Sequence, residues 1–395
     1  MKIKSYLNVL FLAGICMMSA MNVSAQSEKK SAVQISFFPP MSTHGTDAAQ
    51  YTNVFSFNIL AGVSKNETAF TFGSLANIIG NNSNGLQFAG LYNGVGNEGR
   101  GILFSGLLNM VGNSYRGLQF AGLSNMTNRM NGMQFAGLTN LAGDVNGFQF
   151  AGLLNAAKNV SGAQFVGLAN AAGDVSGFQF AGLMNIAKNV SSVQFAGLIN
   201  IAKNVSGLQF AGLINIAKSV SGLQFAGLIN VAESSNCPVG LINLIRNGEK
   251  SVSLTYSEIG STIVAFRSGG KYTYGIVGLG YNFKTKGKAM VSTGGLGAHI
   301  NCTPWLRINN ELSCETVGSF SNSKTTTFRT GYALMPAFKA GKRFEIFAGP
   351  TVNYLQTDDL NNANMFPGNS LWEDWSVSKL QQVYIGYQFG VQFIL

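Results

Sequence analysis

Residues 206–230 read SGLQFAGLINIAKSVSGLQFAGLIN, so the same motif is written twice, fifteen residues apart. Phe and Asn return at equivalent positions, Phe210 and Phe225 for the first and Asn215 and Asn230 for the second. Internal repetition of this kind predicts a fold built from one supersecondary unit used many times.

The motif extends far beyond this stretch. A degenerate copy surrounds Phe57, and CPVGLINLIRNG at 237–248 closes the series, so we take residues 51–248 as the repeat region, with about one strand per unit. The spacing is sixteen residues at first and fifteen afterwards, as the phenylalanines show: Phe72, Phe88, Phe104, Phe120, Phe135, Phe150, Phe165, Phe180, Phe195, Phe210 and Phe225.

Within one unit the side chains alternate as in a β-strand. One face would carry Leu208, Phe210, Gly212, Ile214 and Ile216, and the other Gln209, Ala211, Leu213, Asn215 and Ala217. The polar segment AKSVSG at 217–222 is of turn type. Each unit therefore consists of about ten strand residues and about five turn residues.

The first way to fold the repeats is an antiparallel barrel in an outer membrane. A membrane-spanning strand needs ~9–11 residues, which one unit supplies. The Phe and Leu side chains would face lipid, and Gln209 and Asn215 would face the lumen. With the strands that follow the repeats, this arrangement predicts a barrel of roughly 20–22 strands.

The alternative is a β-solenoid with one coil per unit and stacked Asn side chains, joined to a smaller C-terminal barrel. Antiparallel pairing has a natural period of thirty residues rather than fifteen, and Leu213 is very apolar for a watery lumen. Turns alternating AGDV at 142–145 with AKNV at 157–160 restore part of a thirty-residue period. We expect an all-β fold, with the transmembrane barrel as the leading arrangement and the solenoid as its alternative.

The last third, residues 249–395, continues the strand pattern without the repeat. The terminal QQVYIGYQFGVQFIL alternates throughout and is typical of the closing strand of a barrel. Arg307, Glu311 and Glu315 share one strand face, where charges can pair inside a lumen. Further strands are predicted at 271–283, 288–300, 305–317, 326–338 and 343–355.

A long loop at 356–380 precedes the final strand. It carries Trp372 and Trp375 together with Asp358 and Asp359. Loops of this length are usually functional or disordered, so these four residues are candidates for an exposed contact. Trp side chains also anchor at membrane interfaces, which is the simpler interpretation.

The N-terminus predicts export. Residues 1–25 have Lys2 and Lys4, then an apolar core and Val23-Ser24-Ala25, which together form a cleaved signal peptide. Residues 26–50 would supply an N-terminal strand and loop. No dense Lys/Arg block accompanies the net charge of +10, so nucleic acid is not an expected partner.

The chain resembles a family of bacterial surface-repeat proteins common in Gram-negative gut bacteria. The resemblance covers roughly residues 33–395 and is carried by the GLQFAGLxN units, PVGLINLIRNGEKSVSLTYSE at 238–258, FRSGGKYTYGIVGLGYNF at 266–283, FAGPTVNYL at 347–355 and YIGYQFGVQF at 384–393. It implies an exported protein associated with the outer membrane, and it supplies no catalytic residues.

We therefore expect a non-enzymatic protein of the outer membrane, structural or pore-like, without a cofactor or metal. The two histidines, His44 and His299, lie far apart in the sequence and offer little material for a catalytic triad or a metal site. The alternative function is a surface-displayed solenoid that binds or adheres. The expected partners are outer-membrane lipid and either small solutes or a surface ligand.

Overall fold

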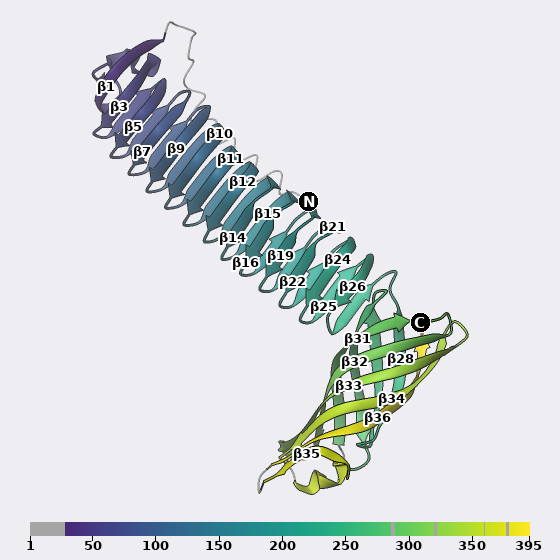
Figure 1. The fold of residues 1–395 in the computed structure, drawn as a ribbon. Coiled ribbons are helices and arrows are strands. Elements are labelled where there is room, and N and C mark those ends of the chain that lie inside the picture. The colour runs from purple at the N-terminus through teal and green to yellow at the C-terminus, as the bar shows by residue number, and fades with distance from the viewer. Residues whose placement is uncertain (1–27, 286–288, 320–321, 359, 377–378) are drawn as a thin grey trace. The chain divides into compact units, whose positions relative to one another are not determined.

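The computed structural model describes residues 28–285, 289–319, 322–358, 360–376 and 379–395 (Figure 1). The fold is all-β, as predicted, with two six-residue 3-10 helices among the described residues. The chain divides into two compact units, one reaching to Ala196 and one beginning at Gly197. Each unit is described by itself.

The N-terminal unit is a parallel β-solenoid. Its elements are β1 (Lys29–Phe38), β2 (Met41–Ser42), η1 (Gly45–Gln50), β3 (Tyr51–Asn58), β4 (Ala61–Ser64), β5 (Asn66–Gly73), β6 (Ala76–Ile79), β7 (Ser83–Ala89), β8 (Tyr92–Val95), β9 (Glu98–Ser105), β10 (Leu108–Ala121), β11 (Ser124–Ala136), β12 (Thr139–Ala151), β13 (Leu154–Val160), β14 (Ala163–Val166), β15 (Ala169–Val175), β16 (Phe178–Ala181), β17 (Met184–Ile186), β18 (Asn189–Val190) and β19 (Val193–Ala196).

Successive coils pair in parallel and in register, so that equivalent residues of the repeat lie side by side. Between β10 and β11, Asn109 pairs with Asn125 and Phe120 with Phe135. The change from a sixteen- to a fifteen-residue period is absorbed by an irregularity after Val111. The predicted N-terminal strand is β1, and it belongs to the first coil because it pairs in parallel with β3.

Each coil bends at its Gly-Leu pair. In the coil Leu154–Gly167, Asn155 and Gln164 point inward and are fully buried, whereas Gly167 and Leu168 are both exposed. Two neighbouring outward residues make a corner, and Asn170 beyond it is buried again. The corner explains why Leu213, which alternation alone places on the inward face, is exposed.

The C-terminal unit contains further coils and then a barrel. Its elements are β20 (Ile199–Ile201), β21 (Asn204–Val205), β22 (Leu208–Ala211), β23 (Ile214–Ile216), β24 (Ser219–Ala226), β25 (Ile229–Ala232), β26 (Ser234–Val239), β27 (Ile242–Ile245), β28 (Lys250–Ser257), β29 (Ser261–Gly269), β30 (Thr273–Asn282), β31 (Ala289–Asn301), β32 (Leu306–Ser319), β33 (Asn322–Ala340), β34 (Phe344–Thr357), η2 (Leu360–Met365), β35 (Ser370–Trp375) and β36 (Leu380–Ile394).

Eight antiparallel strands close the barrel, since β28 pairs with both β29 and β36. The additional strand β35 pairs with the first residues of β36. Along β36, Tyr384, Gln388 and Gln392 are buried, while Ile385 and Phe389 are exposed. The barrel is therefore polar inside and apolar outside over much of its length. A small apolar cluster, which includes Ile259, Val291, Leu355 and Met365, fills part of the interior.

The structure takes the second of the two predicted arrangements. The antiparallel barrel is present, but it comprises residues 250–394 rather than the repeats, and eight strands rather than roughly 20–22 close it. The repeats pair in parallel because stacked coils bring identical side chains next to each other, which antiparallel strands with a fifteen-residue period cannot do. No helix in the described part of the chain is both long and apolar enough to cross a membrane.

Two predicted segments remain, the signal peptide at the N-terminus and the long loop near the C-terminus. The expected signal peptide, residues 1–25, lies outside the described residues. The expected loop at 356–380 is partly ordered into regular structure, as η2 and β35. The change from coils to barrel falls between Ile245 and Lys250.

Candidate functional site

Buried amide ladders hold the coils together. In the N-terminal unit, Nδ2 of Asn140 donates to Oδ1 of Asn155 at 3.0 Å and to the carbonyl oxygen of Phe150 at 2.8 Å. Nε2 of Gln164 donates to Oε1 of Gln149 at 2.7 Å. Because buried amides need partners, a polar interior is stable only when each coil supplies the same group at the same place. This requirement explains the Asn and Gln at every fifteenth position.

The glycine of each corner permits the coils to approach. A Cβ added to Gly152 would lie 2.2 Å from the carbonyl oxygen of Gly137 in the preceding coil, and one added to Gly167 would lie 2.5 Å from that of Gly152. Any side chain at this position would push the coils apart. The row of corner glycines is thus a packing requirement.

The phenylalanines form a stacked row on the outside of the solenoid. Rings of neighbouring coils are nearly parallel, with centroids 4.9 Å apart for Phe120 and Phe135 and 5.0 Å for Phe135 and Phe150. Corner leucines run beside them, each 41–46% exposed: Leu75, Leu91, Leu107, Leu123, Leu138, Leu153, Leu168 and Leu183. We call this Phe row and this Leu row the apolar face.

A groove of about 710 Å³ follows the apolar face. Each coil from Phe120 to Phe195 contributes its Phe to the lining, and most contribute an Ala, which Val166 replaces in one coil. The corner glycines Gly122, Gly137, Gly167 and Gly182 line it as well, and Ser105 lies at one end. The six coils from Phe120 to Phe195 are stacked at roughly 4.8 Å intervals, so this part of the groove is roughly 24 Å long. It is apolar and straight.

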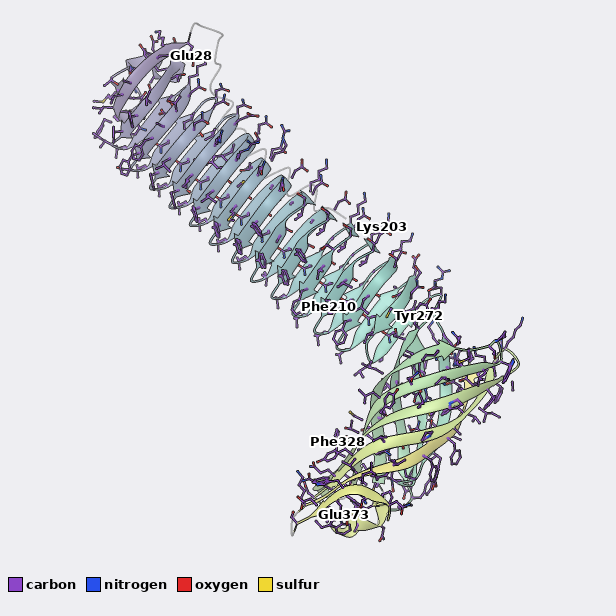
Figure 2. All side chains as sticks on the ribbon, viewed as in Figure 1. Glu28, Lys203, Phe210, Tyr272, Phe328 and Glu373 are labelled. Carbon is purple, nitrogen blue, oxygen red and sulfur yellow. The ribbon has the colours of Figure 1, made fainter. Side chains whose placement is uncertain are left out.

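Charges are gathered on another side of the coils. Between Asn66 and Ala196, all charged residues except the buried Glu67 are exposed in the segments equivalent to residues 217–222, which we call the polar turns although strands run through most of them: Glu98, Arg100, Arg116, Arg129, Asp144, Lys158, Asp174 and Lys188. Figure 2 shows the same separation in the C-terminal unit, where Lys203 and Phe210 project from opposite sides of the coils. The solenoid is therefore amphipathic around its circumference.

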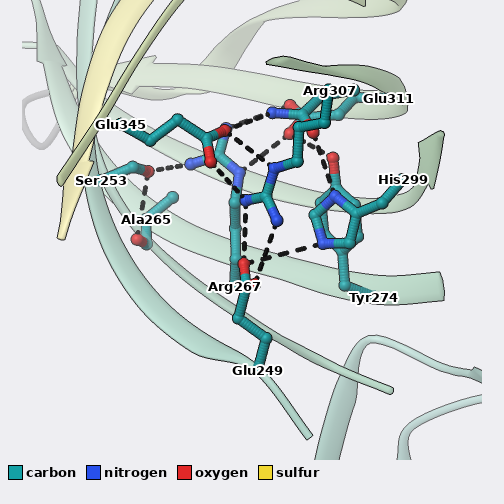
Figure 3. Close-up of polar contacts among 10 residues, drawn as sticks. Glu249, Ser253, Ala265, Arg267, Tyr274, His299, Arg307, Glu311 and Glu345 are labelled. Carbon is teal, nitrogen blue, oxygen red and sulfur yellow. Dashed lines mark hydrogen bonds and ion pairs between the residues drawn. The ribbon is translucent and has the colours of Figure 1, made fainter. Parts of the chain in front are cut away.

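The barrel interior contains a network of ion pairs (Figure 3). Arg267 binds Glu311 through two hydrogen bonds, from Nε at 2.9 Å and from Nη2 at 3.0 Å, and its Nη1 donates to Ser253. The hydroxyl of Tyr274 donates to the same carboxylate at 2.8 Å. Buried charges persist only when they are paired in this way.

Two further arginines complete the network. Arg307 lies between Glu249 and Glu345, with Nη2 at 2.8 Å from an oxygen of each. Arg329 donates from Nη1 to Glu315 at 2.6 Å and lies 3.7 Å from Glu258. The three arginines come from β29, β32 and β33, so the network connects strands around the barrel.

Little space remains beside the ion pair of Arg267 and Glu311. The cavity between Arg267, Glu311 and Gln388 measures about 20 Å³. A cavity of that size holds about one water molecule. An eight-stranded barrel has an interior that side chains can fill, and this one is filled at the ion-pair network.

A polar cavity of about 370 Å³ lies where the last coil meets the barrel rim. Ser235, Asn236 and Asn247 line it from the coils, and Lys271 and Lys339 line it from the barrel. Arg307 and Glu249, which also border it, are already bonded to each other. The cavity therefore offers mixed charges.

The structure places the predicted site residues in three different environments. Gln209 and Asn215 are buried inside a coil of the solenoid, so the expectation that they face a barrel lumen is corrected. The Gly-Leu corner keeps both on the inner side. Arg307, Glu311 and Glu315 are buried in the barrel interior, where each is ion-paired.

The candidate contact residues lie at the two ends of the long segment before β36. Trp372 and Trp375 are exposed on β35, and Asp358 is exposed directly after β34. Asp359 lies outside the described residues. Because β35 pairs with β36, the two Trp side chains belong to a strand rather than to a free loop.

Sequence reasoning missed Arg267, Arg329 and Glu258 as members of the interior network. Arg267 and Glu258 are isolated charges in otherwise uncharged stretches, which was a usable signal. The Phe row was identified, but as a surface for lipid around a barrel, and alternation placed the corner leucines, such as Leu213, on the lumen side.

Among the described residues, no three His, Cys, Asp or Glu side chains lie together as metal ligands would. Comparisons of the chain with protein-family models, with curated proteins and with solved structures returned no match. Its function is therefore argued from the apolar face and the barrel interior.

Proposed function

We propose that the chain is a non-enzymatic surface protein of the outer membrane, in which the barrel is the anchor and the solenoid is a binding surface. The observation that carries the proposal is the separation of polarity in both parts. The coils expose an uncharged apolar face over many repeats, and the barrel exposes an apolar exterior around charged contents.

The barrel exterior supports the anchor. Five of the eight barrel strands expose an apolar side chain that is at least 49% exposed: Leu254, Val264, Leu279, Leu312 and Ile346. Exposing such a surface to water costs about 25 cal/mol of free energy per Å² of apolar area. A closed ring of antiparallel strands leaves no unpaired edge, which is the form that spans an outer membrane.

A conducting role is not proposed, because the ion pairs of Arg267, Arg307 and Arg329 occupy the interior. These charged groups are bonded to one another, with room for about one water molecule beside Arg267. Catalysis in this cavity would require a substrate to enter and a free acid or base to act on it.

The test uses the full chain produced in a Gram-negative cell. We expect the protein to stay in the outer-membrane fraction through carbonate and urea washes, and to migrate faster on SDS gels before heating than after. Planar bilayers containing the purified protein should show no discrete channels. Release by urea as a folded soluble protein would refute the proposal that the barrel is a membrane anchor. Regular channel openings would support a pore-like role instead.

A further inference from the structure

We infer that the apolar face of the solenoid binds the acyl chains of membrane lipid. The inference deepens the proposed function and rests on it, because it names the partner of the proposed binding surface. It is argued from the size, the hydrogen bonding, the shape and the surroundings of that face.

The face is too large to be ordinary protein surface. Corner leucines from Leu75 to Leu183 and rings from Phe72 to Phe195 form two unbroken rows that contain no charged side chain. Nine coils stacked at roughly 4.8 Å, with a width of a few residues on each side of the corner, give an area on the order of 1,000 Å². Monomers rarely expose apolar patches beyond a few hundred Å².

Most backbone amides along the corner are bonded to the preceding coil. The amide of Gly137 donates to Ala121 at 3.1 Å, and those of Leu138 and Thr139 donate to Leu123 at 3.1 and 2.9 Å. The same coil-to-coil bonds recur along the row, so an extended peptide cannot add a strand there, and a glycan would lose its hydrogen bonds to water without replacement. A hydrocarbon chain needs no such bonds.

The groove has the shape of a chain. Its floor is low because the corner glycines carry no side chain, and its wall is the row of Phe rings from Phe120 to Phe195. This shallow, open apolar groove of roughly 24 Å is long enough for an extended acyl chain lying along the solenoid axis.

The surroundings favour membrane lipid over a second copy of the chain. Within the C-terminal unit the coils pass directly into the barrel, and Nδ2 of Asn243 in the last coil donates to the carbonyl oxygen of Ser268 in β29 at 3.1 Å. These coils carry the same exposed rows, including Leu213, Phe225 and Leu228. In this unit the corner Gly240-Leu241 of the last coil packs against β30, since a Cβ added to Gly275 would lie 2.2 Å from the carbonyl oxygen of Leu241. One hydrocarbon phase therefore suits both the apolar rows of these coils and the apolar barrel exterior.

The distribution of charged residues around the coils also favours membrane lipid. Arg100, Arg116 and Lys158 lie in turns on a different side from the Phe row, so the coils can bury the apolar face while the turns stay in water. Amphipathic helices bind membrane surfaces through the same separation of apolar and charged faces.

The experiment places a fluorescent label at one position in the full chain. The native cysteines Cys16, Cys237, Cys302 and Cys314 are first replaced by serine. Single variants Leu138→Cys on the apolar face, Lys158→Cys in a polar turn and Leu279→Cys on the barrel exterior are then labelled and reconstituted in phosphatidylcholine vesicles. Quenching by lipids with doxyl groups on their acyl chains is compared with quenching by iodide in the water.

We expect doxyl lipids to quench the labels at 138 and 279 several-fold more strongly than the label at 158, and iodide to quench mainly the label at 158. If iodide quenches the label at 138 while doxyl lipids quench the label at 279, the lipid inference fails and the membrane anchor stands. If doxyl lipids do not reach the label at 279, the proposed function itself fails. Shielding of the label at 138 from both quenchers, relieved by dilution, would mean that a second copy covers the face and would overturn the inference.

Discussion

Asn155 and Asn170 occupy equivalent positions in successive coils and are joined by a hydrogen bond of 3.1 Å from Nδ2 of Asn155 to Oδ1 of Asn170. The same amide donates to the carbonyl oxygen of Phe165 at 2.9 Å. One buried side chain thus ties two coils together and satisfies the backbone at the neighbouring corner.

Replacing Asn170 by alanine should loosen the solenoid locally. The change removes the acceptor for Asn155 and the donors to Asn185 and to the carbonyl oxygen of Phe180. Unsatisfied buried groups cost about 1–3 kcal/mol each, so we expect a loss of several kcal/mol near this coil. Hydrogen exchange followed by mass spectrometry should show faster exchange in the peptides around residues 155–185.

The matched control is Asn159→Ala. Asn159 lies in a polar turn and bonds the exposed Asp144. Surface changes of this kind usually fall within about 0.5 kcal/mol. Equal loss of protection in both variants would contradict the importance of the buried ladder.

Gly152→Ala should separate neighbouring coils. The new Cβ would lie 2.2 Å from the carbonyl oxygen of Gly137, a backbone atom that cannot rotate away. Overpacking of this kind costs about 1–3 kcal/mol or more. The control is Gly80→Ala in the same unit, where the nearest atom to the added Cβ is 3.7 Å away. We expect Gly152→Ala alone to raise the exchange rates of both adjoining coils, and similar rates in the two variants would refute the requirement.

Much of this fold could be predicted from the sequence. Alternation over 382–395 predicted the closing strand, which is β36. The strands predicted at 305–317 and 343–355 correspond to β32 and β34, with ends that differ by a few residues. Alternation identifies strands well, because burial on one side of a pleated chain requires it.

Alternation could not decide between barrel and solenoid. Both need outward apolar residues and inward amides, as at Phe210 and Gln209. The decision depends on the corner, where Gly212 and Leu213 are both exposed. The apolar side chain of Leu213 was a signal of this break, but alternation alone does not show where the chain turns.

The partners inside the barrel could not be predicted either. Charges at Arg307, Glu311 and Glu315 indicated an inward polar face, but pairing depends on how the strands are staggered. Arg267 meets Glu311 from a strand 44 residues earlier in the chain. The stagger of a barrel follows from its strand number and shear, and assigning the repeats to the barrel predicted too many strands.

Glu67 should make the stability of the solenoid depend on pH. It is buried in the inner row that later coils fill with Val145 and Val160. Burial raises the pKa of Glu67 above its ordinary value of 4.5, although its carboxylate accepts bonds from Asn53 and Ser56.

The direction of the pH dependence follows from how many protons the folded and unfolded states bind. Between the ordinary pKa and the raised one, the folded state holds the proton that the unfolded state releases, so folding stability falls as pH rises through that interval. Glu67→Gln keeps an amide in place of the carboxyl and removes this loss. We expect the variant to be more stable than the natural chain at pH 7 and to show a flatter dependence below it. Hydrogen exchange over residues 51–89 at several pH values measures the difference, and a variant less stable at neutral pH would contradict the prediction.

The pair of Arg267 and Glu311 should behave as a buried ion pair, whose single and double substitutions differ. Arg267→Met leaves the carboxylate of Glu311 with Tyr274 but without its guanidinium, and breaking a buried pair costs about 3–5 kcal/mol. Arg267→Met combined with Glu311→Leu removes both charges and should recover most of that loss. Arg343→Met, at an exposed arginine, is the control. Unfolding by guanidinium in detergent micelles gives the free energies. A single variant as stable as the control, or a double variant worse than the single one, would mean that the interior charges are not held as a mutually compensating pair.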